Sequence, residues 1–189
     1  MTGDNEISYF VFVDNSNVWI EGKRASAVQK GSVTSMQEAH DRNIEDSSWR
    51  IDFGRLLNLI TGGHTELVKK AVLFGSKPPQ NDTLWRAAQF ANFEVNVNER
   101  NAANKEKNVD TAMAVAATAC LYKEAKIGDV FVFVTGDGDF SSAITQIKSE
   151  KNQIKIAFWE NASKTIKEQA DEFINLSKNI NDITWSPYA

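Results

Sequence analysis

The stretch FVFVTGDGDF, residues 131–140, joins a run of apolar residues to two aspartates, Asp137 and Asp139. A short apolar run that ends at glycine is typical of a strand buried on both faces of a parallel sheet. In such a sheet the functional crevice lies beyond the carboxyl ends of the strands. The two aspartates therefore stand where a site is expected, and the strand before them forms a rigid support.

Strand-like and helix-like segments alternate along the rest of the chain. Strands are predicted at residues 9–13, 67–74, 93–97, 130–134 and 154–158. Helical spacing is found at residues 52–61, 82–91, 109–125, 140–151 and 164–173. This alternation predicts a three-layer α/β fold, with a mainly parallel five-stranded sheet and helices on both faces.

The length of 189 residues predicts a single domain, residues 1–189, with its core at about residues 8–176. The polar segment 21–50 is longer than an ordinary connection, so an excursion over the active edge or a flexible flap is expected. Residues 177–189 form a tail with little pattern. Trp185 and Tyr188 suggest that the end of this tail docks against the domain.

Composition excludes several classes of protein. One cysteine and two histidines rule out an internal disulfide framework and the usual zinc cage. A net charge of -4 argues against coating of nucleic acid through bulk positive charge. No apolar run is long enough for a membrane span and no secretory signal is visible, so we expect a cytoplasmic protein without a membrane partner. The sequence is silent on protein partners and oligomeric state.

A second set of polar residues ends the first predicted strand, in YFVFVDNSN. If this strand neighbours the one at residues 130–134, as in the strand order 3-2-1-4-5, then Asp14, Asp137 and Asp139 meet at one point. Asp110, which opens an alanine-rich helix, could supply a fourth carboxylate. Two such charges 4 Å apart repel by roughly 4 kcal/mol at an effective dielectric of 20, and a divalent cation compensates this. Oxygen ligands without histidine suit Mg²⁺ or Mn²⁺.

Each of these residues also has an ordinary structural interpretation. Asp14 or Asn17 alone is more often a turn residue or a helix cap, and Asp110 is as readily an N-cap as a ligand. An isolated GDGD is a plausible surface turn. The coincidence of three acidic features at one expected crevice favours the shared metal site.

Four segments together resemble the NYN domain family, a branch of the PIN-like metal-dependent ribonucleases. They are VFVDNSNVW, KNVDTAMAVAA, VFVTGDGDFSSAI and IKIAFWENASKTIKEQADEFINL. The resemblance implies a Rossmann-like sheet in order 3-2-1-4-5 and cleavage of RNA phosphodiester bonds. It also implies that the catalytic metal ligands are Asp14, Asp110, Asp137 and Asp139. Many relatives carry a further acid two helical turns after the Asp110 position, where this chain reads Val115-Ala116-Ala117.

The resulting hypothesis is hydrolysis of RNA, single-stranded rather than double-stranded, by a metal-activated water. Asn17 would position an acidic ligand or the scissile phosphate, and Lys107 is the best candidate for a backbone contact in the strip that also holds Arg100 and Lys105. Further contacts are expected from Thr135, Ser141 and Ser142, beside a helix start that can accept an anion. Lys23 and Arg24 are weaker candidates for the RNA backbone. Trp19 and Trp85 could stack a base, although core packing is favoured for both.

Two other functions stay open from the sequence. One is an NYN-like module that binds RNA without cutting it, which the missing helix acid favours. The other is a metal-dependent protein-binding module of the von Willebrand A type, whose first motif resembles Asp-x-Ser-x-Ser. Asp14 and Ser16 fit that motif, whereas Val18 replaces its second serine.

Overall fold

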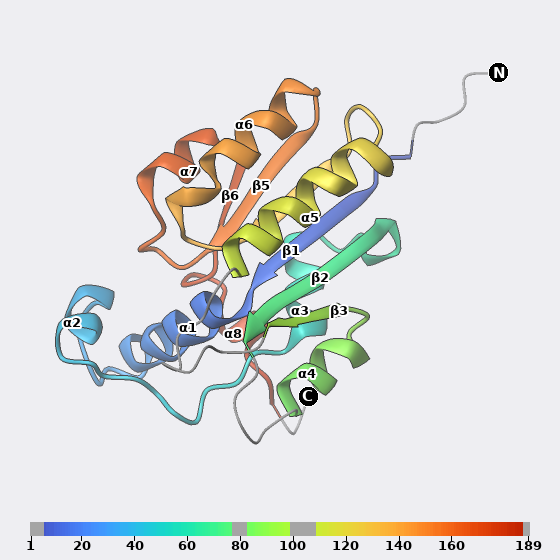
Figure 1. Cartoon of the computed structure of the whole chain (residues 1–189). Helices are drawn as coiled ribbons and strands as arrows, with labels where there is room; N and C mark the ends of the chain where they lie inside the picture. The colour runs from blue at the N-terminus through green and yellow to red at the C-terminus, as the bar shows by residue number, and fades with distance from the viewer. Residues whose placement is uncertain (1–5, 77–82, 99–108, 187–189) are drawn as a thin grey trace.

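One parallel sheet organises the computed structural model, which describes residues 6–76, 83–98 and 109–186 (Figure 1). Within these ranges the strand order is β3-β2-β1-β4-β5-β6. The predicted α/β class and the order 3-2-1-4-5 are confirmed, and a sixth strand extends the sheet. The strands are β1 (Tyr9–Asp14), β2 (Val68–Ser76), β3 (Glu94–Asn98), β4 (Val130–Val134), β5 (Gln153–Phe158) and β6 (Glu172–Asn175).

Strand β1 lies at the centre of the sheet because every one of its side chains is apolar except the last. All six residues of β1 are buried, and the strand pairs in parallel with β2 on one side and β4 on the other. Alternate side chains point to opposite faces. Phe10 stacks on Phe131 with ring centroids 5.0 Å apart, whereas Val11 and Val13 belong to the core on the other face.

Helices cover both faces of the sheet, as predicted (Figure 1). The face that carries Phe10 and Phe12 is covered by α5 (Val109–Lys123), α6 (Ser141–Ser149) and α7 (Lys164–Gln169). The opposite face packs against α1 (Asn15–Gln29), α3 (Phe53–Ile60), α4 (Thr83–Phe90) and α8 (Ile180–Ile183). Two single 3₁₀ turns, Thr65–Leu67 and Gly138–Phe140, precede β2 and α6. No helix within the described residues is long and apolar enough to cross a membrane.

The predicted helix at residues 164–173 is wrong in its second half. Helix α7 ends at Gln169, and Ala170 is already extended, with ψ of 141°. The backbone N–H of Asp171 then donates to the Ile154 carbonyl at 2.8 Å, and the Asp171 carboxylate accepts from the Ile154 N–H. These two bonds turn the chain into strand β6 beside β5, so pairing at the sheet edge overrides the helical spacing.

The polar segment 21–50 is also more ordered than a flap. Helix α1 continues to Gln29, and a short helix α2 (Met36–Asp41) lies at its far end, away from the sheet (Figure 1). Residues 30–50, called the arm below, return to the core through Trp49. This ring is buried, meets Trp159 edge to face at 5.6 Å, and donates from Nε1 to the Thr184 hydroxyl.

Asp46 fastens the arm to α1. Its carboxylate accepts hydrogen bonds from the hydroxyls of Ser26 and Ser48, each at 2.6 Å, and forms an ion pair with Lys30, also at 2.6 Å. Burial opposes ionisation, but the bonds from Lys30, Ser26 and Ser48 outweigh it and hold the pKa of Asp46 well below its ordinary value. Because the folded-state pKa is depressed, the ionised group stabilises the fold above the unfolded-state pKa of about 3.9, and this contribution is lost as the pH falls below it.

We expect Asp46→Asn to lower the thermal midpoint by about 2–4 °C at pH 7, the effect of about 1 kcal/mol in a chain of this size. The difference from wild type should shrink as the pH falls from about 4 toward 2. Thermal melts of both proteins across this range check the prediction. A constant difference at every pH would mean that the carboxylate charge contributes nothing.

The tail docks through residues before its predicted anchors. Ile180 and Ile183 are buried in the core, and the Trp185 N–H donates to the Arg50 carbonyl at 3.0 Å. The Trp185 side chain itself stays half exposed, and Tyr188 lies outside the described residues. The sheet spans residues 9–175, while a single domain over residues 1–189 with its core at about residues 8–176 stays a prediction.

Candidate active site

The carboxyl ends of the central strands β1 and β4 lie side by side, at the point where α1 begins. The two strands pair in register, with Val13 opposite Val134. Asp14 is the last residue of β1 and the N-cap of α1. Its Oδ1 accepts from the Asn17 backbone N–H at 3.2 Å and from the Ser16 hydroxyl at 3.4 Å, and the side chain is buried. Asp14 is therefore a helix cap, as the structural interpretation predicts, and its position also makes it available to the site.

Asp137 is oriented by its own loop. Its N–H donates to the buried Thr135 hydroxyl at 3.2 Å, and its Oδ1 accepts from the Asp139 N–H at 2.9 Å. Gly136 brings this loop against β5, because a Cβ at that position would lie 2.2 Å from a ring carbon of Phe158. The loop thus holds the Asp137 carboxylate near the end of β1.

A cavity of about 460 Å³ collects these groups. Three of the four predicted carboxylates line it, from the end of β1, the first turn of α5 and the loop after β4. Asn17 lines it as well. The full set of lining residues is Asp14, Ser16, Asn17, Ile20, Glu21, Arg24, Val109, Asp110 and Asp137.

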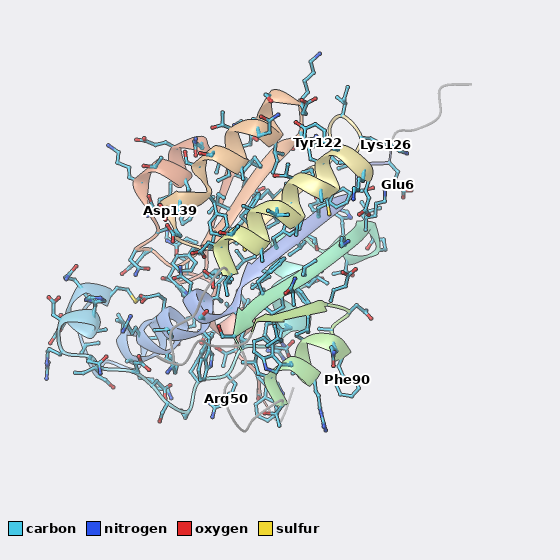
Figure 2. The ribbon with its side chains drawn as sticks, viewed as in Figure 1. Glu6, Arg50, Phe90, Tyr122, Lys126 and Asp139 are labelled. Carbon is cyan, nitrogen blue, oxygen red and sulfur yellow. The ribbon has the colours of Figure 1, made fainter. Side chains whose placement is uncertain are left out.

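The remaining predicted site residues lie elsewhere. Asp139 is exposed just before α6 (Figure 2). It is not among the residues that line this cavity. Thr135 is fully buried, so its observed contact is with the Asp137 backbone. Ser141 and Ser142 open α6, whose N-cap Phe140 offers no side-chain hydrogen bond. The predicted basic strip lies outside the described residues, namely Arg100, Lys105 and Lys107.

Glu21 was missed by sequence reasoning, and Arg24 was considered only as a contact to the RNA backbone. Both lie one or two turns into α1, and the spacing of Asn17, Glu21 and Arg24 places them on one helical face. The signal was present in this spacing, but the segment from residue 21 was interpreted as an irregular excursion.

Glu21 and Arg24 form a partly buried ion pair, with side-chain exposures of 12% and 13%. The Nη1 of Arg24 donates to Oε1 of Glu21, while Asn161 donates to Oε2 at 2.7 Å. From the arm, Glu45 approaches Arg24, with 3.7 Å between Oε1 and Nη2. Glu45 is itself paired with Lys23. The cavity wall on α1 is therefore built from a network of alternating charges.

The donor set of the cavity fits a hard divalent cation. Its ionisable lining groups are carboxylates and one guanidinium, with no thiol or imidazole. Among the described residues, however, no three carboxylate, thiol or imidazole groups lie close enough together to enclose a metal ion. Mg²⁺ needs only one or two carboxylates and otherwise keeps waters or binds phosphate, so an open cavity of this size is compatible with a partly hydrated ion.

Cysteine chemistry has no place at this site. Cys120 is the only cysteine and is one of the buried residues of α5. Burial, partly offset by the nearby Lys70, raises the pKa of its thiol to about 11, so the nucleophilic thiolate is scarce near neutral pH. The acidic cavity therefore carries the chemistry that the described residues offer.

The two tryptophans considered for base stacking belong to the fold. Trp85 is buried in the core, and a Cβ on Gly75 would lie 2.7 Å from its ring. Trp19 is partly buried against the same core, with the Lys23 ammonium 4.4 Å from its ring centroid. The preference for core packing is confirmed for Trp85 and agrees with the position of Trp19.

Comparison with known proteins gives one family match and a similar solved structure. The family model of the NYN domain, a family of PIN-like nucleases, matches residues 10–177. A solved structure of a protein of unknown function from Vibrio parahaemolyticus is similar, with a TM-score of 0.70, 16% sequence identity, and coverage of 98% of this chain and 100% of that chain. At this identity the likeness shows the fold alone. A comparison with curated proteins gives no significant match.

Proposed function

Because this chain belongs to the NYN domain family of PIN-like nucleases, we propose that it is a Mg²⁺- or Mn²⁺-dependent ribonuclease. Its substrate is RNA, preferably single-stranded, and the reaction is hydrolysis of phosphodiester bonds. The observation that carries this proposal is the cavity lined together by Asp14, Asp110 and Asp137. These carboxylates come from three distant parts of the chain and converge where a parallel sheet places its functional crevice.

In this proposal Asp14 and Asp137 bind the cation directly, and Asp110 and Asp139, the latter outside the cavity, take part through bound water. A divalent cation supplies activation of water and stabilises charge on the phosphate. The protein contributes orientation. The Asn17 N–H fixes one oxygen of Asp14, and Thr135 acts through its bond to the Asp137 backbone. Ser141 and Ser142 offer hydroxyls to the RNA at the start of α6, and Lys107 is retained as a backbone contact.

An RNA-binding module without cleavage is the second candidate. Two observations favour it: the sequence lacks the additional helix acid at residues 115–117, and no three ligand groups among the described residues enclose an ion. The von Willebrand A interpretation finds no support in the family match. We further propose a cytoplasmic location and RNA as the partner.

The decisive experiment incubates end-labelled single-stranded RNA with purified protein. We expect cleavage with Mn²⁺ or Mg²⁺ and none after addition of EDTA, because the carboxylates cannot activate water without the cation. The same sequence as a duplex and as single-stranded DNA serves as the control for substrate class. Binding without cleavage under every divalent metal tried would select the second candidate.

A further inference from the structure

The cavity has an imbalance of charge that RNA would make worse. Four carboxylates line it, those of Asp14, Glu21, Asp110 and Asp137, and among the described lining residues the only cationic side chain is Arg24. A phosphodiester entering the cavity adds another negative charge. One metal ion offsets part of this charge, and a protein cation beside the metal offsets more.

Several N–H donors of the Arg24 guanidinium have no acceptor among the described residues. A guanidinium carries five N–H donors. Nη1 donates to Glu21, and Nη2 lies 3.7 Å from Glu45, which is beyond hydrogen-bond distance. Nε is buried and has no hydrogen-bond partner among the described residues. A buried donor without an acceptor costs free energy. A ligand that offers acceptors to this guanidinium would therefore be favoured.

We propose that Arg24 binds a phosphate of the RNA and that Glu21 is its resident counter-ion, displaced when RNA enters. The inference rests on the proposed function only in taking RNA as the ligand and does not require cleavage. A phosphate oxygen is a better partner than one carboxylate oxygen because the planar guanidinium can donate two parallel bonds to it. Glu45 keeps the guanidinium within reach from the arm side, while Asn161 holds Glu21 in place.

Glu21 and Arg24 should consequently have opposite effects on RNA affinity. Loss of the cation removes a phosphate contact, so Arg24→Gln should weaken binding about tenfold. It should also reduce the slope of log affinity against log salt by about 0.7, the value for one contact to a single strand. Glu21→Gln removes the competing charge but keeps the amide oxygen for Asn161, so it should tighten binding by about threefold to tenfold.

The test measures fluorescence anisotropy of a labelled single-stranded RNA of fixed sequence, with EDTA present so that no cleavage occurs. Wild type, Arg24→Gln, Arg24→Lys, Glu21→Gln and the double variant are compared at several salt concentrations. Glu21→Gln should tighten binding more in the wild-type background than in the Arg24→Gln background. The loss of one repulsive charge is common to both backgrounds, whereas release of the arginine occurs only in the first. Arg24→Lys should keep the salt slope, since it keeps the charge.

Lys148→Gln is the matched control. Lys148 pairs with Asp171 beside the start of β5. This is the amino end of the strands, whereas the cavity lies at their carboxyl ends, so removal of Lys148 should leave the RNA affinity unchanged. Thermal melts of each variant show whether it is folded. If Arg24→Gln does not fold, the affinities of Glu21→Gln and Arg24→Lys decide the question.

The outcomes separate this inference from the proposed function. Unchanged affinity in Arg24→Gln, or weaker binding in Glu21→Gln, would make the pair purely structural and overturn the inference, even if wild type cleaves RNA. The predicted opposite effects without Mn²⁺-dependent cleavage would support the inference and reject the ribonuclease. Absence of RNA binding by wild type in EDTA would overturn the inference, and the cleavage assay with Mn²⁺ then decides the ribonuclease separately.

Discussion

Replacement of Asp137 by asparagine is expected to lower Mn²⁺-supported RNA cleavage by roughly a hundredfold or more, with the fold intact. Residues that only support a metal ligand already cost about 10–100-fold when they are lost, and Asp137 is proposed as a ligand itself. The amide oxygen of asparagine can still accept from the Asp139 N–H, so the loop keeps its geometry. One negative charge is removed from the cavity, and the thermal midpoint should stay equal or rise.

Cleavage rates and Mn²⁺ binding by titration calorimetry together check this prediction. Glu150→Gln is the control, because Glu150 is exposed at the end of α6. It lies near the amino end of β5, whereas the cavity lies at the carboxyl ends of the strands. It removes one negative charge without touching the cavity and should leave both quantities unchanged. A strong fall in the thermal midpoint of Asp137→Asn would instead assign this aspartate a structural role.

The second large effect concerns the contact between Gly22 of α1 and the buried ring of Trp49 in the arm. Gly22→Ala is expected to destabilise the protein by about 1–3 kcal/mol, or about 6–12 °C in thermal midpoint at the upper end of that range. A Cβ at this position would lie 2.3 Å from a ring carbon of Trp49 and 2.8 Å from one of Trp159. Both rings are buried, and Trp159 is fixed by a hydrogen bond from Nε1 to the Val18 carbonyl. Neither ring can move without opening the core.

The sign of this effect distinguishes packing from helix propensity. Alanine in a helix is normally more stable than glycine by about 1 kcal/mol. Gly54 in α3 is the matched control, because it is exposed and a Cβ there meets only Asp52 Oδ1 at 3.4 Å. Gly54→Ala should therefore raise the thermal midpoint slightly or leave it unchanged. A similar rise in Gly22→Ala would contradict the close approach of α1 to the two tryptophans.

The sequence predicted the central sheet well because its strands are continuous apolar runs. Residues 130–134 and 9–13 are buried on both faces, and such segments leave few alternatives for the chain. The two errors have local causes. Strand β6 has intermediate burial and was masked by the helical spacing from Ile166 to Phe173. Helix α1 shows almost no separation of apolar and polar faces, since it packs on the core, the arm and the cavity at once.

The candidate site was predicted in part for a similar reason. Asp14, Asp110 and Asp137 follow strands or open a helix, so the topology alone brings them together. Glu21 and Arg24 reach the cavity only because α1 continues from Asp14 as one regular helix. The exclusion of Asp139 from the cavity depends on the tight turn at Gly138–Phe140, which the sequence does not specify.

The central position of β1 has a consequence for how the protein opens. Both edges of β1 are hydrogen-bonded to neighbouring strands, and Asp14 is its last residue. The backbone amides leading to Asp14 can exchange with solvent only when the sheet itself comes apart, so they belong to the slowest-exchanging class. The backbone that carries Asp14 should therefore open only when the whole protein unfolds. Local motions that admit a long polymer to the cavity are confined to the segments around its opening.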